Sequence, residues 1–282
     1  MIVRFPVSSR IPGARRAARW LALRRWGGLE PVVVYQMAKV GSTSVVDALL
    51  RSRLPTFHVH RMNPDHIRRL QAERSDRGWG APPPQLHERL GGQLYERVVQ
   101  RGGPLKVVTL VRDPIARNLS SYFEHLDSIW RTAGAHRVVP FDELCAGFLE
   151  RYTHREPLTW FDDELRPVLG LDVYAQPFPA KGSLIVASDT FDALVLKAEA
   201  PDTEKQRALA AYLGVAVAPI RPANRTAGTV KGLAYSRFVR EVRLPATYVD
   251  SMLDAWYTRH FFSDAERETM REKYLPNGDA KN

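Results

Sequence analysis

The chain has 282 residues, of which 44% are hydrophobic and 26% are charged. This is the composition of a globular protein, and the length is enough for one large α/β domain or two small ones. No run approaches about 18 uninterrupted apolar residues, so we expect no transmembrane helix. The single cysteine, Cys145, excludes an internal disulfide and fits a reducing compartment, which makes the cytoplasm the expected location.

The net charge of +10 is unevenly distributed, which argues against a nucleic-acid-binding protein. Residues 1–30 contain seven arginines and one acidic residue, Glu30, so they carry +6 and the rest of the chain only +4. A secretory signal is not expected, because Arg19 interrupts the apolar stretch at 17–23. We interpret residues 1–30 as a basic N-terminal arm that is solvated or loosely docked. Peripheral contact with an anionic membrane surface, such as the inner membrane, is the alternative.

A strand, a turn and a helix are predicted around the sequence VVVYQMAKVGSTSVVDALL at 32–50. The β-branched run favours a buried strand, and the apolar residues that follow the turn have the spacing of one helical face over 45–52. The turn contains a lysine, a glycine and three hydroxyl residues: Lys39, Gly41, Ser42, Thr43 and Ser44. Because free N–H groups at a helix N-terminus attract anions, we expect this turn to bind a phosphate or a sulfate. It is not a Walker A loop, since Lys39 precedes Gly41 and does not follow it.

A second strand-to-helix turn is predicted in the middle of the chain. Residues 105–111 are apolar and rich in β-branched side chains, Asp113 suits a helix N-cap, and Pro114 suits the first helical position. This arrangement puts Arg112 at the carboxyl end of a strand and Ser120 two turns into the next helix. In an open α/β sheet, ligands bind at that edge.

The remaining segments complete an α/β pattern. A second strand is predicted over 55–61, and its period-2 alternation puts His58 and His60 on the same face. Residues 132–182, which are rich in aromatic residues, Pro and Asp, are interpreted as an insertion. Further strands are expected at 183–187 and 193–197, and further helices near 86–100, 202–213, 233–242, 245–262 and 264–274. We predict one α/β domain over 31–275, with a mainly parallel central sheet flanked by helices, and a C-terminal tail at 276–282.

Two motifs resemble those of sulfotransferases that use 3′-phosphoadenosine 5′-phosphosulfate (PAPS). The order Lys-x-Gly-Ser-Thr-Ser at 39–44 is similar to their 5′-phosphosulfate loop, and Arg112 and Ser120 have the Arg-x7-Ser spacing of their 3′-phosphate motif. The loop looks more like that of the carbohydrate sulfotransferases than that of the small-phenol enzymes. Three later segments are similar to a bacterial group associated with capsular polysaccharide synthesis: 160–162, 170–174 and 224–231. The resemblance covers most of 31–275 and implies a P-loop-like three-layer fold.

The resemblance implies transfer of a sulfuryl group from PAPS to a hydroxyl or amine of an acceptor, such as a glycan, a glycolipid or a small metabolite. Adenosine 3′,5′-bisphosphate would leave, and Lys39 would neutralise charge on the bridging oxygen. The implied cofactor-binding residues are those of the two motifs, namely Lys39, Gly41, Ser42, Thr43, Ser44, Arg112 and Ser120. The Arg-Lys-Gly loop that closes over the 3′-phosphate in cytosolic members would be replaced here by Asn224, Arg225 and Lys231.

A general base must remove the acceptor proton, and members of the family use a histidine or a glutamate near the strand after the loop. His60 is the first choice, because the carboxyl end of the second strand is nearer the cofactor edge, and His58 is the second. His125, on the helix after Ser120, is a weaker choice. No metal is expected, since His58 and His60 alone are insufficient for a zinc site.

Two other classes of protein stay open. A P-loop-like phosphotransferase would need a lysine at the start of the helix and an acidic Mg²⁺ ligand at a strand end, and the sequence offers neither convincingly. A non-enzymatic basic protein that binds nucleic acid or a membrane would explain the arm but not the pair of motifs. Truncation of residues 1–30 distinguishes the two parts, because binding that survives it belongs to the core.

Overall fold

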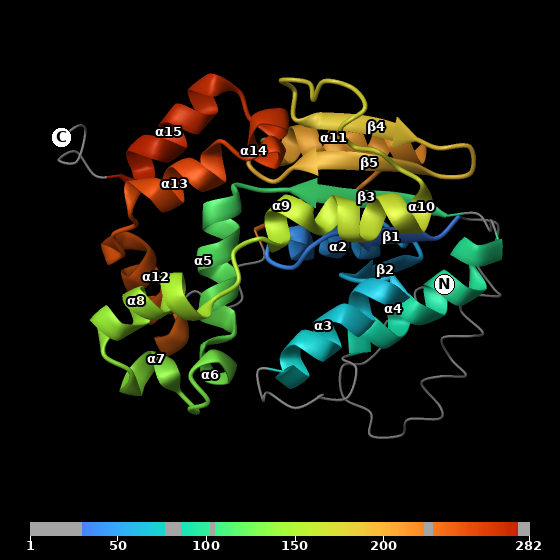
Figure 1. Ribbon diagram of the computed structural model, residues 1–282. Coiled ribbons are helices and arrows are strands. Elements are labelled where there is room, and N and C mark those ends of the chain that lie inside the picture. The colour runs from blue at the N-terminus through green and yellow to red at the C-terminus, as the bar shows by residue number, and fades with distance from the viewer. Residues whose placement is uncertain (1–29, 77–85, 102–104, 223–227, 276–282) are drawn as a thin grey trace.

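The computed structural model describes residues 30–76, 86–101, 105–222 and 228–275. Figure 1 shows a central sheet with helices on both faces and a further group of helices beyond one end of its strands. The arm at 1–29, the tail at 276–282, Asn224 and Arg225 lie outside the described residues. No helix in the described part of the chain is both long and apolar enough to cross a membrane.

Five strands form the sheet in the order β2-β1-β3-β5-β4. Their bounds are Val32–Tyr35 for β1, Thr56–Val59 for β2, Lys106–Val111 for β3, Ser183–Ala187 for β4 and Asp192–Lys197 for β5. All pairs are parallel except β4 with β5, and Val33 of β1 lies opposite Phe57 and Val107. Every residue of β1 is buried, as expected for a central parallel strand that is covered on both faces. The predicted α/β fold with a mainly parallel central sheet is therefore confirmed.

The first half of the chain supplies helices on both sides of the sheet. Their bounds are α2 Ser42–Arg51, α3 Pro64–Asp76, α4 Leu86–Arg97, a 3₁₀ turn Val99–Arg101, α5 Pro114–Glu124 and α6 Leu126–Ile129. The helix predicted at 45–52 thus begins three residues earlier, at the end of the turn itself. The start of α5 is as predicted, because Asp113 Oδ1 accepts hydrogen bonds from the backbone N–H groups of Ile115 at 2.9 Å and Ala116 at 3.0 Å.

The predicted insertion over 132–182 is largely helical. It contains α7 Ala135–Val138, α8 Phe141–Arg151, α9 Glu156–Trp160, a π-helical segment η2 Phe161–Leu165 and α10 Arg166–Leu169. In Figure 1 the α9–α10 segment lies across one face of the sheet, whereas α2 and α11 lie on the other. Trp160 anchors this segment, since its ring packs edge-on against Tyr35 of β1 with the ring centroids 5.0 Å apart.

Among the C-terminal helices, α11 Asp202–Leu213 packs on a face of the sheet against β4 and β5. The others lie beyond the carboxyl ends of the parallel strands (Figure 1), and they are α12 Val230–Glu241, α13 Ala246–Leu253, α14 Trp256–Phe261 and α15 Asp264–Tyr274. The single helix predicted at 245–262 is wrong, because the chain is extended at Ala255 and divides it into α13 and α14. The break allows α14 to bury Tyr257 and Phe261, each 1% exposed, against the body of the domain.

Candidate functional site

The carboxyl ends of three parallel strands carry the residues singled out in the sequence. The loop at 36–41 follows β1, His60 directly follows β2, and Arg112 directly follows β3. From β1 the chain runs first to β2 on one side and then crosses to β3 on the other, so the strand order reverses between β1 and β3. Ligands bind at such a reversal point in open α/β sheets. The loop and Arg112 lie on its two sides.

The loop between β1 and α2 contains two residues in the left-handed backbone region. Lys39 has a φ of 70° and Gly41 a φ of 80°. Gly41 is the N-cap of α2, and no side chain caps the helix there. A Cβ atom at Gly41 would contact nothing, so the backbone conformation and not lack of space requires the glycine. The uncapped helix N-terminus leaves N–H groups available for an anion.

The three hydroxyl residues at the start of α2 have different surroundings. Ser42 is buried, and its Oγ accepts a hydrogen bond from Gln36 Nε2 at 2.9 Å and lies 3.0 Å from His58 Nε2. Ser44 Oγ donates to the backbone carbonyl of Gly41 at 2.9 Å, whereas the side chain of Thr43 is exposed. Ser42 and Ser44 are therefore engaged within the protein, and Thr43 is the exposed hydroxyl of the three.

Positive side chains gather around Glu124 at the end of α5. Lys39 Nζ lies 3.5 Å from Glu124 Oε2, and Lys231 Nζ donates to the Glu124 carbonyl oxygen at 3.2 Å. Arg112 Nη1 donates to the Lys39 carbonyl oxygen at 2.6 Å. Ser120 lies one helical turn before Glu124 and so shares its face of α5. A chain of contacts thus links Arg112 to Lys39, and Lys39 through Glu124 to Lys231, and Ser120 lies on the Glu124 face of α5.

His58 and His60 lie side by side at the end of β2, with ring centroids 4.8 Å apart. Burial lowers the pKa of His58 to about 4 and that of His60 to about 3, so both imidazoles are neutral at pH 7. His60 Nδ1 donates to the Gln36 carbonyl oxygen at 3.0 Å, which leaves Nε2 as the acceptor nitrogen. His58 Nε2 already lies 2.8 Å from Gln36 Nε2. His125, at the far end of α5 from Arg112, donates from Nδ1 to the Ser121 carbonyl oxygen at 2.8 Å.

A cavity of about 610 Å³ lies next to the loop, and Gly41, Ser44 and Arg112 form part of its wall. The segment after β5 adds Glu199, and Phe262 adds an apolar surface between α14 and α15. This volume is typical of a site for a small organic molecule. Sequence reasoning missed both additions. The position of Glu199 just after a strand could have indicated it. No sequence signal indicated that α15 packs over the carboxyl ends of the strands.

Charges of both signs line the cavity. The cations include Arg112, Lys205 and Lys273, and the carboxyl groups include Asp113, Glu199 and Glu266. Burial raises the pKa of Glu199, whose Oε1 accepts a hydrogen bond from the Asp113 backbone N–H at 2.8 Å. A mixed lining of this kind suits a polar organic molecule with an anionic group better than a bare anion.

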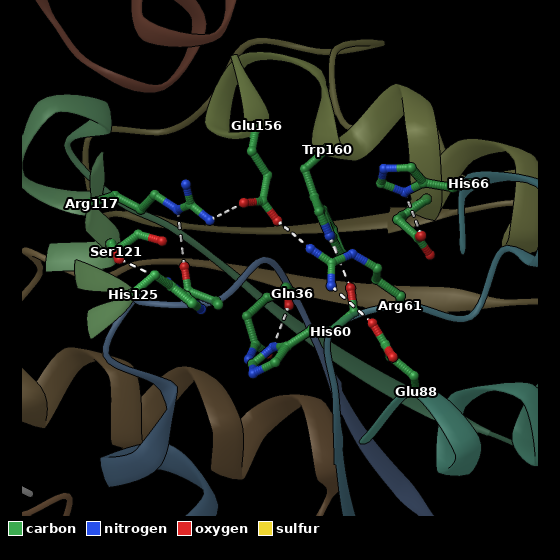
Figure 2. A network of polar contacts seen from close by, with 12 residues as sticks. Gln36, His60, Arg61, His66, Glu88, Arg117, Ser121, His125, Glu156 and Trp160 are labelled. Atoms are coloured by element: carbon green, nitrogen blue, oxygen red, sulfur yellow. Dashed lines mark hydrogen bonds and ion pairs between the residues drawn. The ribbon is translucent and has the colours of Figure 1, made fainter. Parts of the chain in front are cut away.

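A buried ion network lies beside the loop (Figure 2). Arg117 is 0% exposed and pairs with Glu156, which also accepts a hydrogen bond from Arg61 at 3.1 Å; Arg61 in turn lies 3.4 Å from Glu88. Burial alone would raise the pKa of Glu156, but Arg117 and Arg61 lower it to about 2. Sequence reasoning missed this network, because its partners come from separate elements of the chain.

The described residues contain no group of three or more His, Cys, Asp or Glu side chains that could hold a metal ion. No family model matches the sequence. No curated protein and no solved structure matches the chain either. We therefore infer the function from the residues of the site itself.

Proposed function

We propose that this chain is a PAPS-dependent sulfotransferase with a P-loop-like fold. The observation that carries the proposal is the meeting of an anion-binding loop and Arg112 at the reversal point of the sheet, beside a cavity of about 610 Å³. Arg112 Nη1 contacts the Lys39 carbonyl oxygen at 2.6 Å, so the two motifs are joined directly. Two adjoining but distinct anion sites suit a nucleotide that carries separate 5′- and 3′-phosphate groups.

In the proposed complex, the N–H groups of the loop and the hydroxyl of Thr43 hold the 5′-phosphosulfate. Arg112 and Ser120 hold the 3′-phosphate, and the nucleoside lies in the cavity. Acceptor oxygen or nitrogen attacks the sulfur in line with the bridging oxygen, whose bond to sulfur breaks. The Lys39 ammonium group stabilises the charge that develops on the leaving bisphosphate. Catalysis then comes mainly from positioning and charge stabilisation.

His60 is the proposed general base, and His58 is the second choice. His60 is neutral at pH 7 and its Nε2 is the acceptor nitrogen, whereas His58 Nε2 is already in contact with Gln36 and Ser42. The proposed acceptor is a glycan, a glycolipid or a small metabolite with a hydroxyl or amine. Contact of the arm with a membrane surface remains part of the proposal.

Thermal unfolding with adenosine 3′,5′-bisphosphate tests the proposal, with AMP and ADP as comparison ligands. A ligand at a hundred times its Kd stabilises a protein by about 2.7 kcal/mol, which raises the Tm of a domain of this size by several degrees. We expect the bisphosphate alone to produce this shift and Arg112→Ala to abolish it. The matched control is Arg207→Ala, which removes an exposed arginine on α11. Equal shifts with ADP, or none with the bisphosphate, would contradict the proposal and favour a phosphotransferase or a non-enzymatic role.

A further inference from the structure

Arg117 is the most deeply buried charged side chain near the loop, and its donors are directed at four different acceptors. Nε donates to the Ala38 carbonyl oxygen at 3.1 Å, and Nη1 donates to Asn118 Oδ1 at 3.1 Å and to Tyr152 Oη at 2.9 Å. Nη2 is paired with Glu156, as Figure 2 shows. Burying a guanidinium group is costly unless it is paired and fully hydrogen-bonded. Each of the three guanidinium nitrogens has an acceptor here, and Nε is directed at the loop backbone.

The two peptide groups that flank Lys39 are each held by an arginine. The peptide between Ala38 and Lys39 is held at its carbonyl by Arg117, and the peptide between Lys39 and Val40 is held at its carbonyl by Arg112 at 2.6 Å. Since peptide groups are planar, φ and ψ of Lys39 are the rotations that relate these two planes. Fixing both planes therefore fixes the backbone of Lys39.

That backbone needs to be held in place. Lys39 has a φ of 70°, a left-handed conformation that is unfavourable for a residue other than glycine. Each held carbonyl also orients its own N–H group, because the C=O and N–H of a trans peptide point in opposite directions. The N–H groups of Lys39 and Val40 are thereby turned away from the arginines that hold their peptides. Successive N–H groups in a turn that contains a left-handed residue are a known arrangement for binding an anion.

We propose that Arg117 is a positioning residue that, together with Arg112, locks Lys39 and the adjacent N–H groups in the conformation that receives the 5′-phosphosulfate. This inference rests on the proposed function. Glu156 and Tyr152 in turn hold the guanidinium group of Arg117. The ion network of Figure 2 thus fixes the arginine that contacts the loop backbone. Arg117 acts only at the 5′ end of the nucleotide, whereas Arg112 also holds the 3′-phosphate in the proposed complex.

The test is an Arg117→Lys variant, whose affinities for adenosine 3′,5′-bisphosphate and adenosine 3′-phosphate are measured by calorimetry. Lysine keeps the charge beside Glu156 but has a single ammonium group, so it cannot also donate from an Nε position to Ala38. We expect Kd for the bisphosphate to rise about tenfold or more and Kd for adenosine 3′-phosphate to stay within about twofold. The matched control is Arg207→Lys, the same substitution at an exposed arginine of α11, which should leave both values unchanged.

A merely structural role predicts a different result, because general loosening would weaken both ligands equally. Equal losses, or no loss, would overturn the inference. A wild-type protein that binds neither ligand would refute the proposed function instead. A second measurement then tests whether Arg117 holds the loop. In ligand-free wild-type protein, Arg117 Nε–H should exchange with solvent at least about a hundredfold more slowly than that of exposed Arg207. Equal exchange rates would show that Arg117 does not hold the loop. The same measurement tests the inference in the case that Arg117→Lys does not fold.

Discussion

A Glu156→Gln substitution should remove one negative charge from the buried network with little change in side-chain shape. Glu156 pairs with Arg117, which is 0% exposed, and accepts a hydrogen bond from Arg61 at 3.1 Å. The substitution leaves Arg117 without its ion-pair partner, whereas Arg61 keeps Glu88 at 3.4 Å. Uncompensated buried charge is strongly destabilising, so the free energy of unfolding should fall.

Two independent estimates agree on the size of this loss. Removing one partner of a buried ion pair costs about 3–5 kcal/mol. Burial alone would raise the pKa of Glu156, yet the arginines lower it from 4.5 to about 2, and at about 1.4 kcal/mol for each pH unit this corresponds to about 3–4 kcal/mol. We therefore expect a loss of about 3 kcal/mol at pH 7, or a Tm lower by about 6–12 °C.

Urea unfolding of the wild type and the variant at several pH values is the assay. Because the pKa of Glu156 is lower in the folded chain than in the unfolded chain, its contribution is present above about pH 4.5 and is lost as the pH falls toward 2. The difference between the two proteins should shrink over that range. As a control, Glu204→Gln removes one partner of an exposed pair with Arg207 and should cost less than about 1 kcal/mol. A loss below about 1 kcal/mol for Glu156→Gln at pH 7, or a difference that does not change with pH, would refute the reasoning.

Three further predictions concern the pH dependence of stability and two glycines. Burial lowers the pKa of His60 to about 3, so the unfolded chain binds more protons than the folded chain below about pH 6.5. The free energy of unfolding should therefore fall as the pH drops from 6.5 toward 3, and His60→Asn should reduce this pH dependence in urea unfolding. An unchanged pH dependence in His60→Asn would contradict this prediction. In Gly91→Ala, a Cβ atom would lie 1.8 Å from the Arg61 carbonyl oxygen, so the free energy of unfolding should fall by more than about 2 kcal/mol, and a loss below about 0.5 kcal/mol would count against the packing described. In Gly41→Ala, the added Cβ atom meets no neighbour, but a residue with a side chain must adopt a φ of 80°. The free energy of unfolding should therefore fall by about 1–2 kcal/mol in the same assay. An unchanged free energy of unfolding would mean that the loop can adopt another conformation.

Elements whose signals lie within a few residues were predictable from the sequence. The β-branched run gave β1, Asp113 and Pro114 gave the start of α5, and Gly214 gave the end of α11. The break between α13 and α14 was not predictable, because Ala255 is a good helix former in isolation. Its extended conformation is set by tertiary packing, which buries Tyr257 on the far side of the break.

The site was predictable only where one stretch of sequence contains a whole motif. Lys39 and Gly41 share one turn, and Arg112 and Ser120 share one strand-to-helix turn, so their spacing was visible. The contact of Arg117 with the Ala38 carbonyl oxygen joins residues 79 positions apart and had no local signal. The cavity wall from α15 was hidden for the same reason, since only the packing of the C-terminal helices brings it to this edge.

The loop combines a fixed backbone with a side chain that is only weakly held. Arg112 and Arg117 hold the two peptides that flank Lys39, and Arg117 is itself inside a buried network. The Lys39 ammonium group, in contrast, is 3.5 Å from a Glu124 carboxylate, and the two side chains are 32% and 54% exposed. A pair this exposed contributes less than about 1 kcal/mol, so an incoming anion can take the ammonium group from it at little cost. A site that transfers a charged group needs both properties, because its N–H donors must be in place before the ligand arrives and its cation must follow the charge as a bond breaks.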